Sequence, residues 1–243
     1  MLSSTRRRTE RSRPRKLLGA ILLLIGVVTD AQAFLKIEGT RLIYAGTDRE
    51  ASIGVVNQSQ QNTLMQSWIT YAYDNDRGDA PFAIVQPLVQ LGSQERHLVR
   101  VFYAGQGLPE DRESMLWLNI LEAPRKPDQE DGVQFAIRQR LKLFYRPPGL
   151  HGSSSESVQQ LKWEINQRAQ IEVSNPGAFH VSLVNLEVGL NNRKIFLCDY
   201  LFLRPGETHS IETPLSALDG KVQITFTEIT DGGLQVHRKA NLK

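Results

Sequence analysis

The sequence of 243 residues contains a single cysteine, Cys198. The chain therefore cannot form an internal disulfide, and its stability must come from its hydrophobic core. Cys198 lies in the apolar stretch 195–201, which predicts a strand with a buried, inert thiol; a reactive or intermolecular thiol is the alternative. Repeats, low-complexity tracts and a sustained helical period are also missing, which speaks against a helical or disordered chain.

Motifs of catalysis and metal binding are absent as well. The five histidines show no metal-ligand spacing, and there is no His-Glu-x-x-His, nucleophile elbow or phosphate loop. Asp111 and Glu113 are close in sequence, but Arg112 between them favours structural salt bridges over acid–base catalysis. The sequence therefore predicts no enzyme, no cofactor and no metal site. The alternative is a catalytic triad assembled from residues far apart in the sequence, which no local motif would reveal.

The first 33 residues differ in character from the rest. They carry seven basic residues between Arg6 and Lys16, then the short apolar run 17–28, and end in Ala31-Gln32-Ala33. This pattern predicts a secretory signal cleaved after Ala33; the alternative is an N-terminal membrane anchor. Without this segment the chain holds 22 basic and 24 acidic residues, a net charge of −2. That balance offers no basic field for nucleic acid.

Short runs of alternating apolar residues fill the remaining chain. In 51–56, for example, Ala51, Ile53 and Val55 share one face. Further predicted strands are 41–44, 64–73, 97–103, 115–121 and 133–145, and then 161–165, 169–174, 180–188, 194–203 and 222–227. The proline-rich and serine-rich segment 146–155 between the two sets predicts a flexible linker. We therefore expect an all-β fold with two β-sandwich domains, residues 34–149 and 150–243.

Three segments resemble the periplasmic pilus (fimbrial) assembly chaperones, the PapD-like family. Residues 108–120, LPEDRESMLWLNI, are similar to the signature of that family; 141–147, LKLFYRP, and 39–44, GTRLIY, are similar to the end and the first strand of its first domain. The resemblance implies two immunoglobulin-like domains in a boomerang arrangement. It also implies a periplasmic chaperone that binds pilin subunits and delivers them to an outer-membrane usher. The short connection 125–132 indicates the short-loop type.

The stretch 133–143 has an apolar face. Val133, Phe135 and Ile137 share it, Gln139 interrupts it, and two leucines resume it. Alternation alone leaves two interpretations open, a face that fills the core of its own domain or an exposed edge strand. The resemblance implies that Val133, Phe135 and Ile137 form a donor strand, which completes the fold of the subunit.

Two further sets of residues follow from the resemblance. Arg41 and Lys142 match the basic pair of the family, which binds the C-terminal carboxylate of the subunit. From the residue types alone, two solvated surface charges are the simpler interpretation. Glu113, Arg146 and Asp219 match an ion network between the domains, but Asp219 before a glycine is equally a turn residue.

The functional alternatives predict different exposures. Because the sequence has no ATP site, release of a subunit would require strand exchange at the usher. An exposed donor strand would favour a homodimer in which each chain covers the donor strand of the other. The alternative function is an exported immunoglobulin-like adhesion or carbohydrate-binding module, in which 133–137 is buried within the chain. A periplasmic hydrolase is a more distant alternative.

Overall fold

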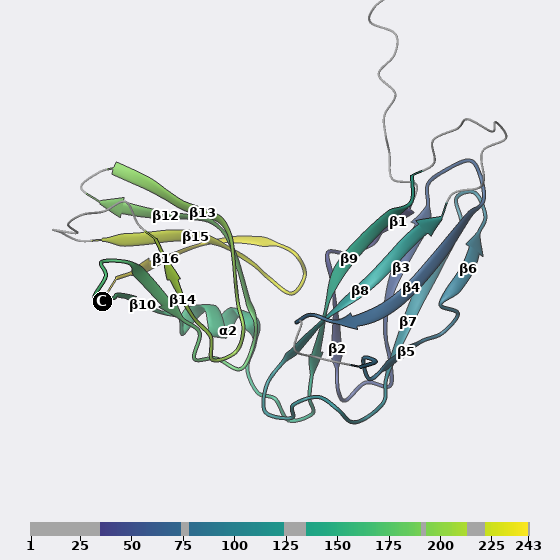
Figure 1. The fold of residues 1–243 in the computed structure, drawn as a ribbon, viewed down its shortest axis with the longest axis horizontal. Coiled ribbons are helices and arrows are strands. Elements are labelled where there is room, and N and C mark those ends of the chain that lie inside the picture. Colours follow the sequence, from purple (N-terminus) through teal and green to yellow (C-terminus); the bar gives the residue numbers. More distant parts are fainter. Residues whose placement is uncertain (1–34, 74–77, 124–134, 191–192, 213–221, 243) are drawn as a thin grey trace, which may run out of the picture. The chain divides into compact units, whose positions relative to one another are not determined.

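The computed structural model describes residues 35–242 except 74–77, 124–134, 191–192 and 213–221. The proposed signal, residues 1–33, lies outside the described residues. Strands dominate the described chain (Figure 1). They pack around two hydrophobic cores. The predicted all-β fold with two sandwich domains is confirmed.

The first domain is built from two sheets that face each other across one core. Its described strands are β1 (Leu35–Ile37), β2 (Arg41–Ala45), β3 (Ala51–Asn57), β4 (Thr63–Tyr71), β5 (Phe82–Ile84), β6 (Leu88–Leu91), β7 (Arg96–Tyr103), β8 (Ser114–Ala123) and β9 (Ile137–Arg146). One sheet has the order β1-β3-β7-β5 and the other β2-β9-β8-β4-β6. As the alternation predicts, Ile53 and Val55 are buried from the first sheet, and Leu118 and Leu143 from the second. Each such side chain contributes about 1.5–3 kcal/mol on burial.

The second domain repeats this construction. It contains α2 (Ser154–Gln159) and the strands β10 (Lys162–Ile165), β11 (Ile171–Ser174), β12 (Val181–Leu190), β13 (Arg193–Leu203), β14 (Thr208–Ile211), β15 (Gln223–Ile229) and β16 (Gln235–Asn241). The sheets have the orders β10-β11-β14 and β13-β12-β15-β16. Between them Trp163 stacks on Phe226 with ring centroids 5.6 Å apart.

A short helix replaces part of the predicted flexible linker. Ser153 caps α2, because its hydroxyl accepts a hydrogen bond of 3.2 Å from the backbone N–H of Glu156. Serine at the N-cap with glutamate three residues later is a helix-start signal, so the serine run is ordered by capping. Val158 then anchors the helix in the second core.

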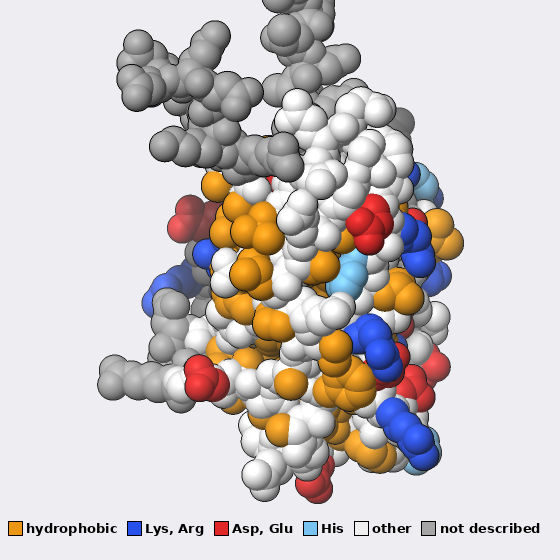
Figure 2. Space-filling model, turned by 90° about the vertical axis from the view of Figure 1, so that its right-hand side faces the viewer, with side chains coloured by type: hydrophobic (Ala, Val, Ile, Leu, Met, Phe, Trp, Pro, Cys, Tyr) orange, Lys and Arg blue, Asp and Glu red, His pale blue; other side chains and the backbone are white. Residues whose placement is uncertain are grey.

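The strand predicted over 133–145 begins later than expected, at Ile137. The pairing with β8 starts at Ile137, opposite Glu122, and Phe135 and Ala136 lie outside the strand. The sequence also missed β1, β5 and β6, which have only three or four residues each. It missed β14 and β16 as well, whose exposed polar residues hide the alternation. Apolar side chains still reach the surface at several places, interspersed with charged ones (Figure 2); Leu88 is 58% exposed.

Cys198 lies on β13 as predicted and is partly buried rather than fully buried. Burial, together with the charge of Asp199, raises the pKa of its thiol. A raised pKa disfavours the nucleophilic thiolate, in agreement with the predicted inert thiol.

Candidate functional site

The two basic side chains chosen from the sequence lie next to each other. β2 pairs with β9 in parallel, and the register sets Arg41 opposite Lys142. Leu42 and Leu143, the next residue on each strand, are buried in the core, so Arg41 and Lys142 point to the outer face of the sheet. The fold therefore brings the pair together, while the role assigned to it stays a prediction.

Lys142 lies against three side chains of β12 and β13. Its Nζ donates to Ser182 Oγ at 3.3 Å and to the hydroxyl of Tyr200. It also sits 3.7 Å from the ring centroid of Phe202. Burial, and then the charge of Arg41, lowers the pKa of Lys142 to about 8. The ammonium is thus held among apolar and neutral groups, without a counter-ion in the described residues.

The guanidinium of Arg41 likewise lies among a neutral acceptor and an aromatic ring. Its Nη1 donates to the carbonyl of Ile229 at 3.3 Å, and its guanidinium lies 5.9 Å from the centroid of Phe144. Nε is buried and has no hydrogen-bond partner in the described part of the chain. Burial lowers the pKa of Arg41, against the nearby charge of Asp231. Two desolvated cations with free donors form a site that suits a carboxylate.

The buried ammonium should make stability depend on pH. Below pH 8 Lys142 is charged in the folded and the unfolded chain, so the whole cost of burying the charge is present. Between pH 8 and the ordinary lysine pKa of 10.5, the folded chain has lost the proton and the unfolded chain retains it. The free energy of unfolding should therefore rise with pH in this window. Urea unfolding at several pH values should show the rise in the wild type and not in Lys142→Met; equal slopes would contradict the assignment.

The donor residues are exposed where the structure describes them. Phe135 is 76% exposed and Ile137 is 38% exposed; Val133 lies outside the described residues. This exposure disagrees with the alternative in which 133–137 is buried within the chain. β9 pairs with β8 from Ile137 onwards, but with β2 only from Lys142. The other edge of residues 137–141 therefore has no strand partner in the described chain.

The side chain of Gln139 makes a hydrogen bond at this open edge. The amide of Gln139 donates to the carbonyl of Leu35 at 3.0 Å, which ties β9 to the start of β1. The backbone N–H of Leu35 in turn donates to Glu122 on β8 at 3.3 Å. The polar residue that interrupts the apolar face thus marks the point where β9 is held within its own domain.

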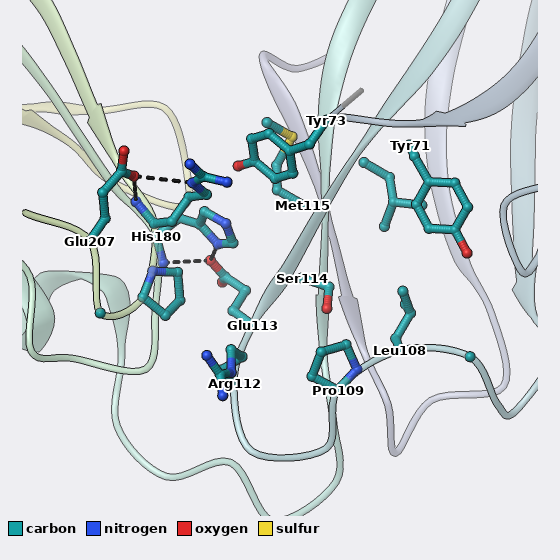
Figure 3. A pocket seen from close by; sticks show the side chains of 15 residues that line it. Tyr71, Tyr73, Leu108, Pro109, Arg112, Glu113, Ser114, Met115, His180 and Glu207 are labelled. Atoms are coloured by element: carbon teal, nitrogen blue, oxygen red, sulfur yellow. Dashed lines mark hydrogen bonds and ion pairs between the residues drawn. The ribbon is translucent and has the colours of Figure 1, made fainter. Parts of the chain in front are cut away.

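Glu113 and Arg146 form the predicted ion pair. Arg146 Nε lies 2.7 Å from Glu113 Oε2, and the Glu113 side chain is only 1% exposed. Glu113 Oε1 also accepts from the backbone N–H of His180 at 2.9 Å and lies 2.9 Å from its ring Nδ1 (Figure 3). Asp219, the third predicted member, lies outside the described residues.

The carboxylate that completes the pairing of Arg146 is Asp231. Arg146 Nη1 and Nη2 each lie 2.8 Å from an oxygen of Asp231, a bidentate geometry. Burial raises the pKa of Asp231, but the hydrogen bond and charge of Arg146 outweigh it and lower that pKa. Burial likewise lowers the pKa of Arg146, and its two carboxylate partners raise it above the ordinary value. Sequence reasoning missed Asp231, whose only signal is a turn of aspartate before two glycines.

A pocket of about 480 Å³ lies beside this network (Figure 3). Glu113 and His180 line it together with Tyr73, Arg112 and Arg204, whereas Arg41 and Lys142 do not. Arg112 pairs with Asp111, so the carboxylates at 111 and 113 hold arginines, as the sequence predicted. The pocket and the basic pair are therefore distinct features.

Candidate metal sites and candidate membrane-spanning helices are both missing from the described residues. No group of histidine, cysteine, aspartate and glutamate side chains there could hold a metal ion. None of the helices in the same residues has the length and apolar character to cross a membrane.

Comparison with known proteins agrees over nearly the whole described chain. The family model "Pili and flagellar-assembly chaperone, PapD N-terminal domain" matches residues 34–151. The model "Pili assembly chaperone PapD, C-terminal domain" matches residues 156–240.

Individual relatives carry corresponding names. "Chaperone protein FimB/FhaD" of Bordetella pertussis is 38% identical over 184 residues, which cover 72% of this chain and 75% of that protein. "Probable fimbrial chaperone YadV" of Escherichia coli is 31% identical over 225 residues, 86% of this chain and 90% of the relative. The crystal structure of the YadV chaperone superposes with a TM-score of 0.75 at 28% identity, over 86% of this chain and all of that one. A complex of Salmonella enterica SafA pilin with the SafB chaperone matches at 24% identity with a TM-score of 0.71, over 87% of this chain and 98% of that one, which shows the fold.

Proposed function

This chain belongs to the family of PapD-like pilus-assembly chaperones, and from that premise we propose that it binds pilin subunits by donor-strand complementation. Phe135 and Ile137 of the chain, with Val133 before them, would fill the apolar groove of an incomplete subunit. Main-chain hydrogen bonds along the edge of 137–141 would supply affinity, and the alternate side chains would supply specificity. The subunit would then pass to an outer-membrane usher by strand exchange.

The observation that carries this proposal is the edge of β9 at 137–141, which no strand covers in the described chain, next to two cations that form no ion pair there. Arg41 and Lys142 lie where β2 begins to pair with β9, so they close one end of the open stretch 137–141. A chain that ends in a carboxylate at this pair and runs along 137–141 has only one direction open to it. It must run parallel to β9, as β2 does.

The basic pair would also set the register. A strand added to an edge can slip by a residue and so present the wrong side chains. A terminal carboxylate held by Arg41 and Lys142 fixes one end and removes that freedom. This physical role goes beyond added affinity, because it decides which subunit residues meet Phe135 and Ile137.

The remaining assignments follow from the same premise. Residues 1–33 would direct export to the periplasm and be removed after Ala33, leaving domains at 34–149 and 150–243. Glu113 and Arg146 would link the two domains, a role that their pairing with each other and with Asp231 supports. The high exposure of Phe135 favours a homodimer that covers the donor strand when no subunit is bound.

Serine at position 135 should separate binding from stability. Phe135 is 76% exposed, so Phe135→Ser should change the free energy of unfolding by less than about 0.5 kcal/mol. Losing the burial of one phenylalanine in the subunit groove should weaken pilin binding roughly tenfold to a hundredfold. Co-expression with a cognate pilin, followed by measurement of the soluble complex, tests this. Leu234→Ser, at a leucine that is 70% exposed, is the matched control and should bind normally. If both variants recovered the pilin as well as the wild type, the donor role of Phe135 would be wrong.

A further inference from the structure

The surroundings of Lys142 contain a third hydrogen-bond donor, the hydroxyl of Tyr200. Tyr200 lies on the outer face of β13, opposite Val184 on β12, and is 50% exposed. In the neighbouring position of the same face, Phe202 lies opposite Ser182. The sheet thus presents a hydroxyl, a ring and a second hydroxyl to the ammonium of Lys142.

The hydroxyl of Tyr200 is hydrogen-bonded to both Lys142 and Ser182. Lys142 has only donors, so the Tyr200 oxygen accepts the hydrogen bond from Nζ. Ser182 is also hydrogen-bonded to Tyr200, and because its hydroxyl can donate to the Tyr200 oxygen, the Tyr200 O–H can be directed to a ligand. Burial raises the pKa of Tyr200, against the opposing effects of Ser182 and Arg41, so this hydroxyl keeps its proton at neutral and mildly alkaline pH.

Aromatic rings, which accept hydrogen bonds only weakly, make up much of the surroundings of Arg41 and Lys142. The Arg41 guanidinium lies 5.9 Å from the ring centroid of Phe144, and Lys142 Nζ lies 3.7 Å from the ring centroid of Phe202. His180 stacks on Phe202 at 5.3 Å with an interplanar angle of 13°, and its Nδ1 is engaged by Glu113. The aromatic rings attract the cations through their faces, and in the described residues the two cations donate only to Ser182, Tyr200 and the Ile229 carbonyl, so further N–H groups remain for a ligand.

We propose that the hydroxyl of Tyr200 is the third donor of the carboxylate site formed by Arg41 and Lys142. Its ligand is the C-terminal carboxylate of an extended peptide chain, so the inference rests on the proposed function and adds a specificity residue to it. A carboxylate has two oxygens with about four lone-pair positions, and a guanidinium, an ammonium and a phenol can occupy three of them. A terminal carboxamide has one acceptor oxygen and two N–H donors, which would face the donors of the site. Tyr200 therefore contributes to the distinction between a chain terminus and an ordinary amide.

The test uses two soluble peptides of alternating valine and serine residues, each with an N-terminal polyethylene glycol chain. One ends in a free carboxylate and the other in a carboxamide, and binding to the full chain without residues 1–33 is measured by titration calorimetry. Wild type should prefer the carboxylate. Tyr200→Phe should weaken the carboxylate peptide by about tenfold, since a hydrogen bond to a charged group is lost, and leave the carboxamide peptide within about twofold.

Two controls keep the result specific. Tyr73→Phe alters a tyrosine that lines the separate pocket of Figure 3, and should change neither affinity. Thermal unfolding of Tyr200→Phe should match that of the wild type, because the ring is retained. Equal weakening of both peptides, or no weakening of either, would overturn the role of Tyr200 while the basic pair stood. A wild type that fails to distinguish the two peptides would overturn the carboxylate site itself, and Tyr200 with it.

Discussion

Replacement of Lys142 by alanine should weaken binding of a cognate pilin by about thirtyfold or more. Truncating one partner of a buried, hydrogen-bonded charge pair costs about 2–5 kcal/mol in complexes, and the lower value corresponds to this factor. Lys142 meets that condition, since it is largely removed from water and has no counter-ion in the described residues before the subunit arrives. Arg41→Ala should have an effect of the same order, and the double variant should lose the complex in co-expression.

The matched control is Lys162→Ala. Lys162 is exposed on β10 and forms no ion pair in the described chain, so its loss should leave pilin recovery unchanged. Thermal unfolding of Lys142→Ala should show no loss of stability, because the substitution removes a charge that is costly to bury. If Lys142→Ala and Arg41→Ala recovered as much soluble pilin as Lys162→Ala, the anchoring mechanism would be wrong.

The second large effect is expected at Arg146. Arg146→Met should lower the free energy of unfolding by about 3–5 kcal/mol, because it leaves Glu113 buried without a cation. The Glu113 side chain is 1% exposed, so water cannot replace the lost guanidinium. Asp231 loses its bidentate partner in the same substitution. Urea unfolding at neutral pH measures the difference.

Arg100→Met provides the comparison at an exposed pair. Arg100 also lies in a salt bridge, with Glu50, but these side chains are 49% and 33% exposed. The loss in free energy of unfolding for Arg100→Met should be below about 1 kcal/mol.

The paired Asp231 has a lowered pKa, so its share of the stabilisation is present at neutral pH and is lost as the pH falls through that pKa. The difference in free energy of unfolding between the wild type and Arg146→Met should therefore become smaller as the solution is made acidic. Similar losses for Arg146→Met and Arg100→Met would show that the network is not a buried one.

The sequence predicted the parts of the fold and site that depend on alternation and on family motifs. The all-β domains follow from runs such as 51–56, whose Ile53 and Val55 are buried as expected. The basic pair was found through two motifs far apart in the chain, and the parallel register of β2 with β9 places Arg41 beside Lys142. Exposure of Phe135 could not be decided from alternation, since a core face and an edge face have the same period.

The rest depends on long-range geometry. Asp231 and His180 meet Arg146 and Glu113 only after the second domain has folded, and neither has a distinctive local pattern. The position of Tyr200 is set by its register with β12, which depends on a bulge between Leu186 and Glu187. One residue of slip would turn its hydroxyl to the other face of the sheet. By contrast, α2 was predictable, because Ser153 and Glu156 form a recognisable capping pattern.

Amide hydrogen exchange along β9 tests most directly whether this edge receives a subunit strand. In the chain without residues 1–33, kept dilute enough to be monomeric, amides of 137–141 that point to the open edge should exchange readily, because no strand covers that edge in the described residues. In the purified complex with a cognate pilin, these amides should become protected by at least about tenfold. Amides on the edge of β16, Gln235–Asn241, that no described strand covers should not change. Unchanged exchange at 137–141 in a complex that is otherwise intact would contradict strand donation by β9.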